Sequence, residues 1–237
     1  MPGICGNGEG MMTDQTFEKD LFKTSLGPLE ITFIGHGSLI LEVTGKVIHV
    51  DPYAAQADYG LLPKADIILV THEHGDHMDM SAIESIRKSD TRFIYTAACQ
   101  DNLQGGHVMK NGDTHEESGF SFKAVPAYNM LHKRENGQPF HPPGVGNGYV
   151  LTIGTTRLYI AGDTEDIPEM ADIKDIDIAF LPMNLPYTMT PEMVTRAALS
   201  FRPRILYPYH YGQSSTNELV RLLKDEPAIE VRIRNLQ

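Results

Sequence analysis

The sequence predicts an α/β (α+β) fold: a four-layer αββα sandwich in which two mixed β-sheets face each other and helices cover the outside. Three observations lead to this fold class. Short apolar runs of strand character recur along the chain, separated by Gly, Pro and Asp. Strand-like and helix-like segments alternate in the later part of each half. The second half loosely repeats the order of the first, and no Pro/Ser-rich linker separates the two, which indicates one domain.

The first half begins with three strands in succession, expected at 29–35, 38–44 and 46–52. The second boundary, Gly45-Lys46, suits a tight hairpin. The continuous apolar run at 66–71 is typical of a strand buried on both faces. Helical spacing of Met80, Ile83 and Ile86 predicts a helix over 79–89, and a further strand follows at 92–97.

The second half predicts a similar series of elements. Strands are expected at 120–128, 148–154, 157–163, 177–183, 204–210 and 228–234, and helices at 190–201 and 216–226. The first of these helices starts well, because Thr190 is a favourable N-cap and Pro191 fits the first helical position. A long irregular stretch at 129–147 interrupts the series, and a loop of this length within a compact domain is usually functional.

Composition and charge restrict the function classes. Of 237 residues, 41% are hydrophobic and 22% are charged, which excludes a disordered chain. A formal charge of −11 opposes non-specific binding to nucleic acid. No apolar run approaches the roughly 20 residues that span a bilayer. Residues 1–25 resemble no secretory signal and are expected to be a flexible leader or an expression remnant, followed by one domain at 26–237. With only two cysteines, these features favour a cytoplasmic protein.

A dense group of metal-ligand residue types follows the buried strand at 66–71, in the run His72-Glu73-His74-Gly75-Asp76-His77. Imidazoles and a carboxylate suit Zn²⁺, with Mn²⁺ and Fe²⁺ as alternatives. Alternate residues of an extended segment point the same way, so His72 and His74 can bind one ion together. Asp76 and His77 lie beyond the bend at Gly75 and can turn toward a second ion. The segment therefore predicts a metal site.

This His-x-His-x-Asp-His segment resembles the signature of the metallo-β-lactamase superfamily, and the resemblance runs from about Leu29 to the C-terminus. The αββα sandwich of that family agrees with the predicted fold. The resemblance implies that Asp163, in a Gly-Asp-Thr turn, bridges two ions. It also implies that His210 is the last ligand and that Asp51 supports the metal-binding loop, since ligand histidines need an acceptor for their other N–H.

Three further segments, GHGSLILE, PYTMTPEM and PYHYG, resemble the branch that contains ascorbate-6-phosphate lactonase and related metal-dependent hydrolases. In that branch the residue at His36 lies close to the metals. The chain departs from the family at Asn129, where a third histidine for the first ion is normal, and an amide oxygen is a weak ligand. His132 and His141 are alternatives. We favour His141, because its segment leads back into the strand before Asp163, and we keep Asn129, His141 and His36 as candidate third ligands or substrate contacts.

The resemblance implies a hydrolase that holds two divalent ions, Zn²⁺ being favoured. A metal-bound hydroxide would attack a carbonyl carbon or a phosphorus atom, with Asp76 as the catalytic residue that orients the water and moves its proton. The expected substrate is a small acidic or phosphorylated lactone, ester or amide, since the helix at Thr190 offers N–H groups to an anion. The alternative within the hydrolases is a phosphodiesterase, of small-molecule or phospholipase D-like type.

Two readings from other classes remain. Some superfamily members are non-haem-iron redox enzymes, although di-iron members usually carry an acidic ligand where this chain has His74. The other is a non-catalytic binding protein that kept the fold, which the retained ligand set opposes. We expect a small-molecule partner, no nucleic acid and no membrane span. The sequence does not indicate the oligomeric state.

Overall fold

The computed structural model describes residues 15–237, which form two seven-stranded β-sheets. The first sheet consists of β1 (Glu18–Thr24), β2 (Gly27–Gly35), β3 (Ser38–Val43), β4 (Lys46–Val50), β5 (Ile67–Leu69), β6 (Arg92–Tyr95) and β7 (His107–Val108). The second consists of β8 (Thr114–Glu117), β9 (Phe120–Ala127), β10 (Gly146–Ile153), β11 (Thr156–Ile160), β12 (Ile178–Pro182), β13 (Ile205–Tyr209) and β14 (Glu230–Val231).

Both sheets have the same topology. In the first, β1 to β4 pair antiparallel, and β5, β6 and β7 then continue the sheet in parallel. In the second, β8 to β11 pair antiparallel, and β12, β13 and β14 continue in parallel. Parallel neighbours need crossover connections, and these crossovers place helices outside the sheets. The predicted mixed-sheet sandwich, with its repeated halves, is confirmed.

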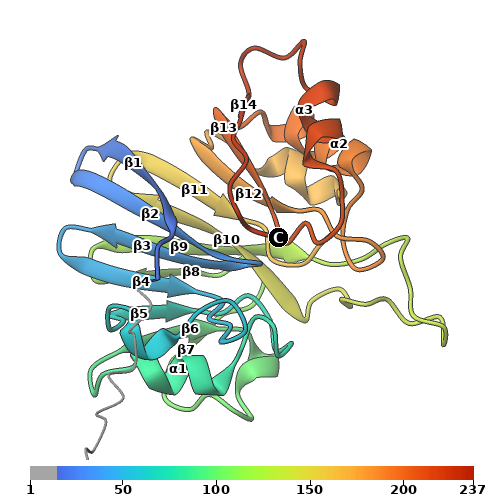
Figure 1. The fold of residues 1–237 in the computed structure, drawn as a ribbon. Helices are drawn as coiled ribbons and strands as arrows, with labels where there is room; N and C mark the ends of the chain where they lie inside the picture. The colour runs from blue at the N-terminus through green and yellow to red at the C-terminus, as the bar shows by residue number, and fades with distance from the viewer. Residues whose placement is uncertain (1–14) are drawn as a thin grey trace, which may run out of the picture.

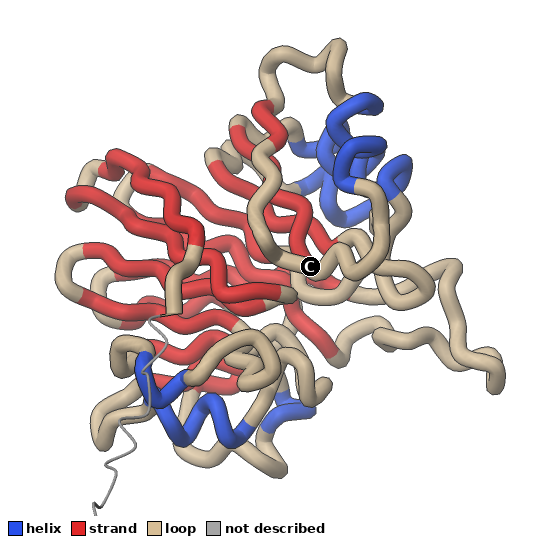
Figure 2. The backbone as a smooth tube through the Cα atoms, in the orientation of Figure 1, coloured by secondary structure: helices blue, strands red, loops and turns tan. Residues whose placement is uncertain are grey.

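Helices form the two outer layers. Figure 1 shows α1 (Met80–Ile86) beside β5 to β7, and α2 (Pro191–Phe201) and α3 (Thr216–Leu222) beside β12 to β14. Three short 3₁₀ helices complete the set within residues 15–237: η1 (Tyr59–Leu61), η2 (Ala97–Cys99) and η3 (Pro168–Asp172). Strands dominate the centre of the molecule and helices its two outer faces (Figure 2). This is the αββα order of layers.

The largest apolar core lies between the two sheets. It joins Phe33 of β2 to Phe180 and Tyr207 of the second sheet, with ring centroids 5.1 Å apart between Phe33 and Tyr207 and between Phe180 and Tyr207. A second cluster lies between the second sheet and α2 and α3, and a third between the first sheet and α1. Burial of this area drives folding, and the shared core packs the two sheets against each other.

Three strands were not expected from the sequence, and all of them lie at sheet edges. They are β1, β7 and β8. Edge strands carry charged residues on exposed positions, which blunts their tendency to pair with other chains and weakens the apolar signal. Because Glu18–Thr24 form β1, the expected leader at 1–25 ends too late; its first 14 residues lie outside the described part of the chain. The β3–β4 hairpin was predicted correctly, with Thr44 at φ 53° and Gly45 at φ 75°.

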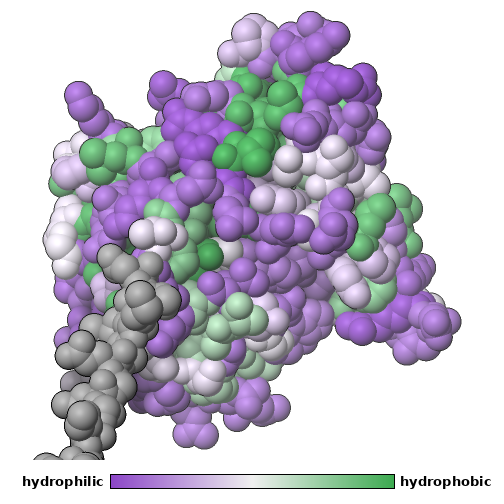
Figure 3. Space-filling model, in the orientation of Figure 1, coloured by the Kyte–Doolittle hydropathy of each residue, from purple (hydrophilic) through white to green (hydrophobic). Residues whose placement is uncertain are grey.

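One face of the molecule is largely hydrophilic. Figure 3 shows a face on which polar residues predominate and apolar residues form separate patches. No helix among residues 15–237 is long and apolar enough to cross a membrane.

Candidate metal centre

The candidate residues come together at one end of the sandwich, although they lie far apart in the sequence. The connections that follow strands of both sheets supply them, as is general for ligand sites of sheets with parallel strands. They come from the β2–β3 turn (His36), the ends of β4 (Asp51) and β5 (His72, His74, Asp76, His77), the loop before β10 (His141), and the ends of β11 (Asp163) and β13 (His210).

Three of these residues have a left-handed backbone, which is unusual for residues other than glycine. The φ angles are 54° at His36, 43° at Asp51 and 47° at His210. The His210 N–H donates to the His36 carbonyl oxygen at 3.0 Å, and this bond joins the first sheet to the second beside the site. Strained backbone of this kind tends to gather at functional sites, so the geometry supports a function at this end of the molecule.

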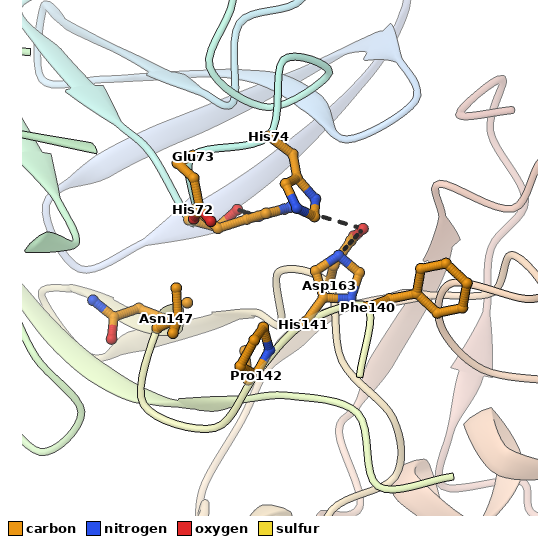
Figure 4. Close-up of a pocket in the computed structure, with 12 residues that line it drawn as sticks. His72, Glu73, His74, Phe140, His141, Pro142, Asn147 and Asp163 are labelled. Atoms are coloured by element: carbon orange, nitrogen blue, oxygen red, sulfur yellow. Dashed lines mark hydrogen bonds and ion pairs between the residues drawn. The ribbon is translucent and has the colours of Figure 1, made fainter. Parts of the chain in front are cut away.

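The side chains form two groups joined by a shared carboxylate. His72, His74 and His141 have ligand atoms within 4.8 Å of one another, as do the members of a second group: His36, Asp76, His77 and His210. Asp163 lies between the groups. Its Oδ2 is 3.2 Å from His141 Nε2 and 3.5 Å from His210 Nε2, and its Oδ1 is 3.5 Å from His77 Nε2. Figure 4 shows His72 and His74 facing His141 and Asp163 across this space.

Several buried polar atoms at this centre have no hydrogen-bond partner among the described residues. They are His72 Nε2, His77 Nε2, His210 Nε2 and Asp163 Oδ1. Buried polar groups are nearly always hydrogen-bonded, so four such atoms at one point need an explanation. Imidazole nitrogens and a carboxylate oxygen converging on one space are the donor set of a divalent cation such as Zn²⁺. The residues present therefore fit a metal centre.

Electrostatics keep the carboxylates of this centre ionised. Burial alone would raise the pKa of Asp163, but the neighbouring His210, His77 and His141 outweigh it and hold that pKa well below its ordinary value. Burial lowers the pKa of His72 well below 6.5, and the nearby His77 lowers it further. A neutral imidazole and an ionised carboxylate are the forms that bind a metal ion.

Asp51 lies directly behind the cluster and is completely buried. Its Oδ2 accepts hydrogen bonds from His77 Nδ1 at 2.8 Å and from Thr71 Oγ1 at 2.6 Å, and its Oδ1 accepts one from the Thr71 N–H at 2.8 Å. Since Thr71 Oγ1 donates to Asp51, it is free to accept from His72 Nδ1, which lies 3.0 Å away. Both histidines are thus oriented with Nε2 toward the centre. For His77, the carboxylates of Asp163, Asp51 and Asp76 outweigh burial and raise the pKa to about 9.

The side chains of Asn129 and His132 are not among those that converge on the centre. Asn129 uses its side chain to contact His141, Glu165 and the Tyr187 carbonyl group. His132 Nδ1 lies 2.8 Å from Glu165. His141, from the far end of the same loop, is the residue whose imidazole reaches Asp163.

A cavity of about 480 Å³ opens beside the cluster. Besides cluster residues, Arg134, Phe140, Asn184 and Tyr187 line it. The rings of Phe140 and Tyr187 pack edge to face with centroids 5.1 Å apart, and the Arg134 guanidinium lies 5.1 Å from the Phe140 ring.

The start of α2, expected to bind an anion, is not among the residues that line this cavity. Its N-cap, Thr190, accepts a hydrogen bond from the Met193 N–H at 3.2 Å, and Glu192 adds a negative charge to the first turn. This arrangement is an ordinary helix cap.

Comparison with known proteins decides the family. A model of the "Beta-lactamase superfamily domain" matches residues 30–210. The chain belongs to the metallo-β-lactamase superfamily. A similar chain is the UPF0173 metal-dependent hydrolase MK1542 of Methanopyrus kandleri, which is 30% identical over 198 residues, covering 78% of this chain and 84% of the relative.

Solved structures agree with this membership of the metallo-β-lactamase superfamily. A protein of Parabacteroides distasonis assigned as a metal-dependent hydrolase is 54% identical, with a TM-score of 0.89 over 94% of this chain and 100% of the other. Igni18, a metallo hydrolase of Ignicoccus hospitalis, is 23% identical with a TM-score of 0.72 over 88% and 95% of the two chains, and shows the shared fold. The enzyme class expected from the sequence, a metal-dependent hydrolase, is also the class named for these proteins.

Sequence reasoning missed several residues that surround the centre. The cavity side chains Arg134, Phe140 and Tyr187 come from irregular segments, where no periodicity indicates which side chains point inward. Glu165 is completely buried and takes hydrogen bonds from the 129–141 loop. Its signal was present in the sequence: an acidic residue two positions after Asp163, in a turn between apolar segments.

Proposed function

We propose that this member of the metallo-β-lactamase superfamily is a hydrolase with two metal ions at the centre described above. The observation that carries the proposal is the position of Asp163 between two groups of ligand side chains, within 3.5 Å of His141, His77 and His210. Two adjacent groups that share a carboxylate are the arrangement expected of a binuclear site.

The first ion would be held by His72, His74 and His141, and the second by Asp76, His77 and His210, with Asp163 shared by both. His36 adjoins the second group, with its Nε2 3.0 Å from Asp76 Oδ2. Because nitrogen ligands predominate, Zn²⁺ is the favoured ion, with Mn²⁺ and Fe²⁺ as alternatives.

When bound, two such ions lower the pKa of a water molecule toward neutrality and polarise the bond under attack. The protein supplies a carboxylate to position that water. Asp76 is suited to this role because its side chain is 37% exposed toward the cavity, whereas that of Asp163 is 4% exposed. Its Oδ2 contacts His36, which gives a donor–acceptor pair at the cavity wall for moving a proton.

The lining of the cavity supports a small acidic or phosphorylated ester, lactone or amide as substrate. Arg134 is the only Lys or Arg side chain that lines the cavity in the described structure, and no carboxylate lies within ion-pair distance of it there. Two bound divalent ions would further make the site positive, and about 480 Å³ accommodates a small molecule. The acidic surface agrees with a small-molecule rather than a nucleic-acid substrate, and the free, buried thiol of Cys99 agrees with a cytoplasmic location.

Metal content is the first test. We expect two ions per wild-type chain by elemental analysis, and fewer in Asp163→Asn, because the shared carboxylate loses its charge. Asp172→Asn, a change at an exposed position away from the centre, is the control and should bind two ions. A wild-type chain that takes up no divalent ion would overturn the proposal.

Hydrolysis of a matched pair of esters tests the substrate class. We compare 4-nitrophenyl hemisuccinate, which carries a carboxylate, with neutral 4-nitrophenyl butyrate. A hydrogen bond to a charged group contributes about 1.5–3 kcal/mol, so Arg134→Gln should lower kcat/KM for the hemisuccinate at least tenfold and leave the butyrate nearly unchanged. Lys133→Gln, the neighbouring exposed cation, is the control. An equal effect on both esters would refute anion recognition by Arg134.

A further inference from the structure

Glu165 is a buried carboxylate that binds a whole segment of the loop between β9 and β10. Its side chain is fully buried, and its Oε2 accepts hydrogen bonds from the Met130 and Leu131 N–H groups, each at 2.7 Å. Its Oε1 accepts one from the His132 N–H at 2.7 Å and lies 2.8 Å from His132 Nδ1. No Lys or Arg pairs with it in the described structure. These backbone donors therefore hold the carboxylate, and it in turn fixes the start of the loop.

Asn129 connects this carboxylate to His141. Its Nδ2 donates to Glu165 Oε1 at 3.1 Å and to the Tyr187 carbonyl oxygen at 2.9 Å, and both of these partners are acceptors. Its Oδ1 lies 2.8 Å from the backbone N–H of His141, which can only donate. Each end of the amide thus faces partners that admit one orientation, and the oxygen is the end that faces His141.

This orientation determines the tautomer of His141. The same Asn129 Oδ1 lies 2.7 Å from His141 Nδ1. An amide oxygen can only accept, so Nδ1 must carry a hydrogen, and Nε2 is the ring nitrogen left to bind a metal ion. His141 Nε2 faces Asp163 Oδ2 at 3.2 Å. The contact with Asn129 therefore directs the ligand atom Nε2 at the metal centre.

We propose that Glu165 and Asn129 are positioning residues that preset His141 as an Nε2 ligand of the first metal ion. The inference rests on the proposed function, since it assigns a role at the same centre. Asp163 and Glu165 are two residues apart in one turn, so a single turn supplies the shared carboxylate and also orients a ligand from a loop more than twenty residues upstream. Partners behind a ligand histidine typically change metal affinity about 10–100-fold, and this is the effect expected here.

Two variants test the chain of contacts at different points. Asn129→Ala removes the acceptor of His141 Nδ1 directly. Glu165→Gln keeps the size of the side chain but replaces one oxygen by an NH₂ group, which then faces at least two N–H donors of the loop. Asp66→Asn is the matched control, because Asp66 accepts a backbone N–H from Val47 but lies at the start of β5, at the end of the strand away from the centre.

The first readout needs no metal. Two-bond ¹H–¹⁵N NMR spectra of the metal-free protein, with the His141 signal assigned by its absence from His141→Gln, should show a protonated Nδ1 in the wild type and in Asp66→Asn. In Asn129→Ala the signal should shift toward a mixture of tautomers, and Glu165→Gln should shift it in the same direction. A wild-type ring that is protonated on Nε2 and carries no hydrogen on Nδ1 would overturn the proposal.

The second readout is Co²⁺ binding followed by visible absorption. We expect Asn129→Ala and Glu165→Gln to bind one of two ions about 10–100-fold more weakly and to lose its part of the spectrum, while Asp66→Asn retains both. Unchanged affinity for both ions in the two variants refutes the positioning role of Glu165 and Asn129 but leaves the proposed function standing. A wild type that binds no ion refutes the proposed function, and the NMR spectra then still decide the tautomer of His141.

Discussion

Gly162, which precedes the shared carboxylate Asp163, occupies a position where a side chain has no room. Its φ of 66° is left-handed, and a Cβ atom there would lie 2.8 Å from the Asn147 carbonyl oxygen and 3.1 Å from Thr71 Cβ. Both neighbours are firmly held, since the Asn147 N–H donates to the Thr71 carbonyl oxygen at 2.9 Å. We predict that Gly162→Ala destabilises the fold and distorts the metal centre.

The magnitude of this effect can be worked out by comparison with Gly45. A left-handed backbone costs a residue with a Cβ atom about 1–2 kcal/mol, and overpacking adds about 1–3 kcal/mol. Gly45 has a φ of 75° and nothing within 4 Å of its Cβ position, so Gly45→Ala carries the first cost alone. We expect a loss of about 1 kcal/mol for Gly45→Ala and about 3 kcal/mol for Gly162→Ala.

Urea unfolding of the metal-free proteins measures both losses, and titration with Zn²⁺ measures the centre. Because Thr71 precedes His72, a shift at Gly162 reaches ligands on both sides of the site, and affinity for Zn²⁺ should fall in Gly162→Ala but not in Gly45→Ala. If the two variants lose the same stability and bind Zn²⁺ equally, the close packing of this turn has no energetic consequence, and the reasoning is wrong.

Three further predictions concern stability. Burial lowers the pKa of His49 to about 4 although its Nε2 contacts the Pro63 carbonyl oxygen, so this histidine's contribution is complete above pH 6.5 and is lost as the pH falls to about 4. That loss amounts to about 3 kcal/mol of unfolding free energy in the wild type. Urea unfolding at pH 7 and pH 4 should show that His49→Gln lacks this part of the pH dependence. Asp20 pairs through both oxygens with Arg234 at 2.7 and 2.8 Å; Asp20→Asn should cost about 2 kcal/mol in the same assay, whereas no loss would contradict a role in holding the C-terminal segment. Chelation should lower the melting temperature, because ions bound at a thousand times their Kd contribute about 4 kcal/mol, and an unchanged temperature would argue against tight binding.

The sequence predicted the interior of the fold better than its edges. Buried strands such as β5 and β12 are continuous apolar runs, and the period of their pattern indicates their structure. The edge strands β1 and β8 have the sequence pattern of polar segments, because their outer residues face water. These edge strands form because a neighbouring strand pairs with them. Their own local sequence pattern therefore gives little indication of a strand.

The candidate site divides in the same way. The run from His72 to His77 is local, and its spacing alone indicates a metal site. His141 could be favoured over Asn129 only because of where its segment leads, since proximity between a loop and a distant turn is a property of the folded chain. The route from Glu165 through Asn129 to His141 was beyond prediction, because it depends on hydrogen bonds between residues 36 and 12 positions apart in the sequence.

The strain in the backbone connects the stability of the fold to its site. His36, Asp51 and His210 have positive φ angles, and a sparsely populated backbone conformation costs about 1–3 kcal/mol at each residue. Such angles persist only where the surroundings hold them: His210 is bound through its N–H to His36, and Asp51 through its carboxylate to Thr71 and His77. The sandwich core therefore offsets several kcal/mol of strain at one end of the molecule. The strained backbone holds the ligand atoms in position before an ion binds. An ion entering the centre therefore need not order the protein first, and binding avoids a large entropic cost.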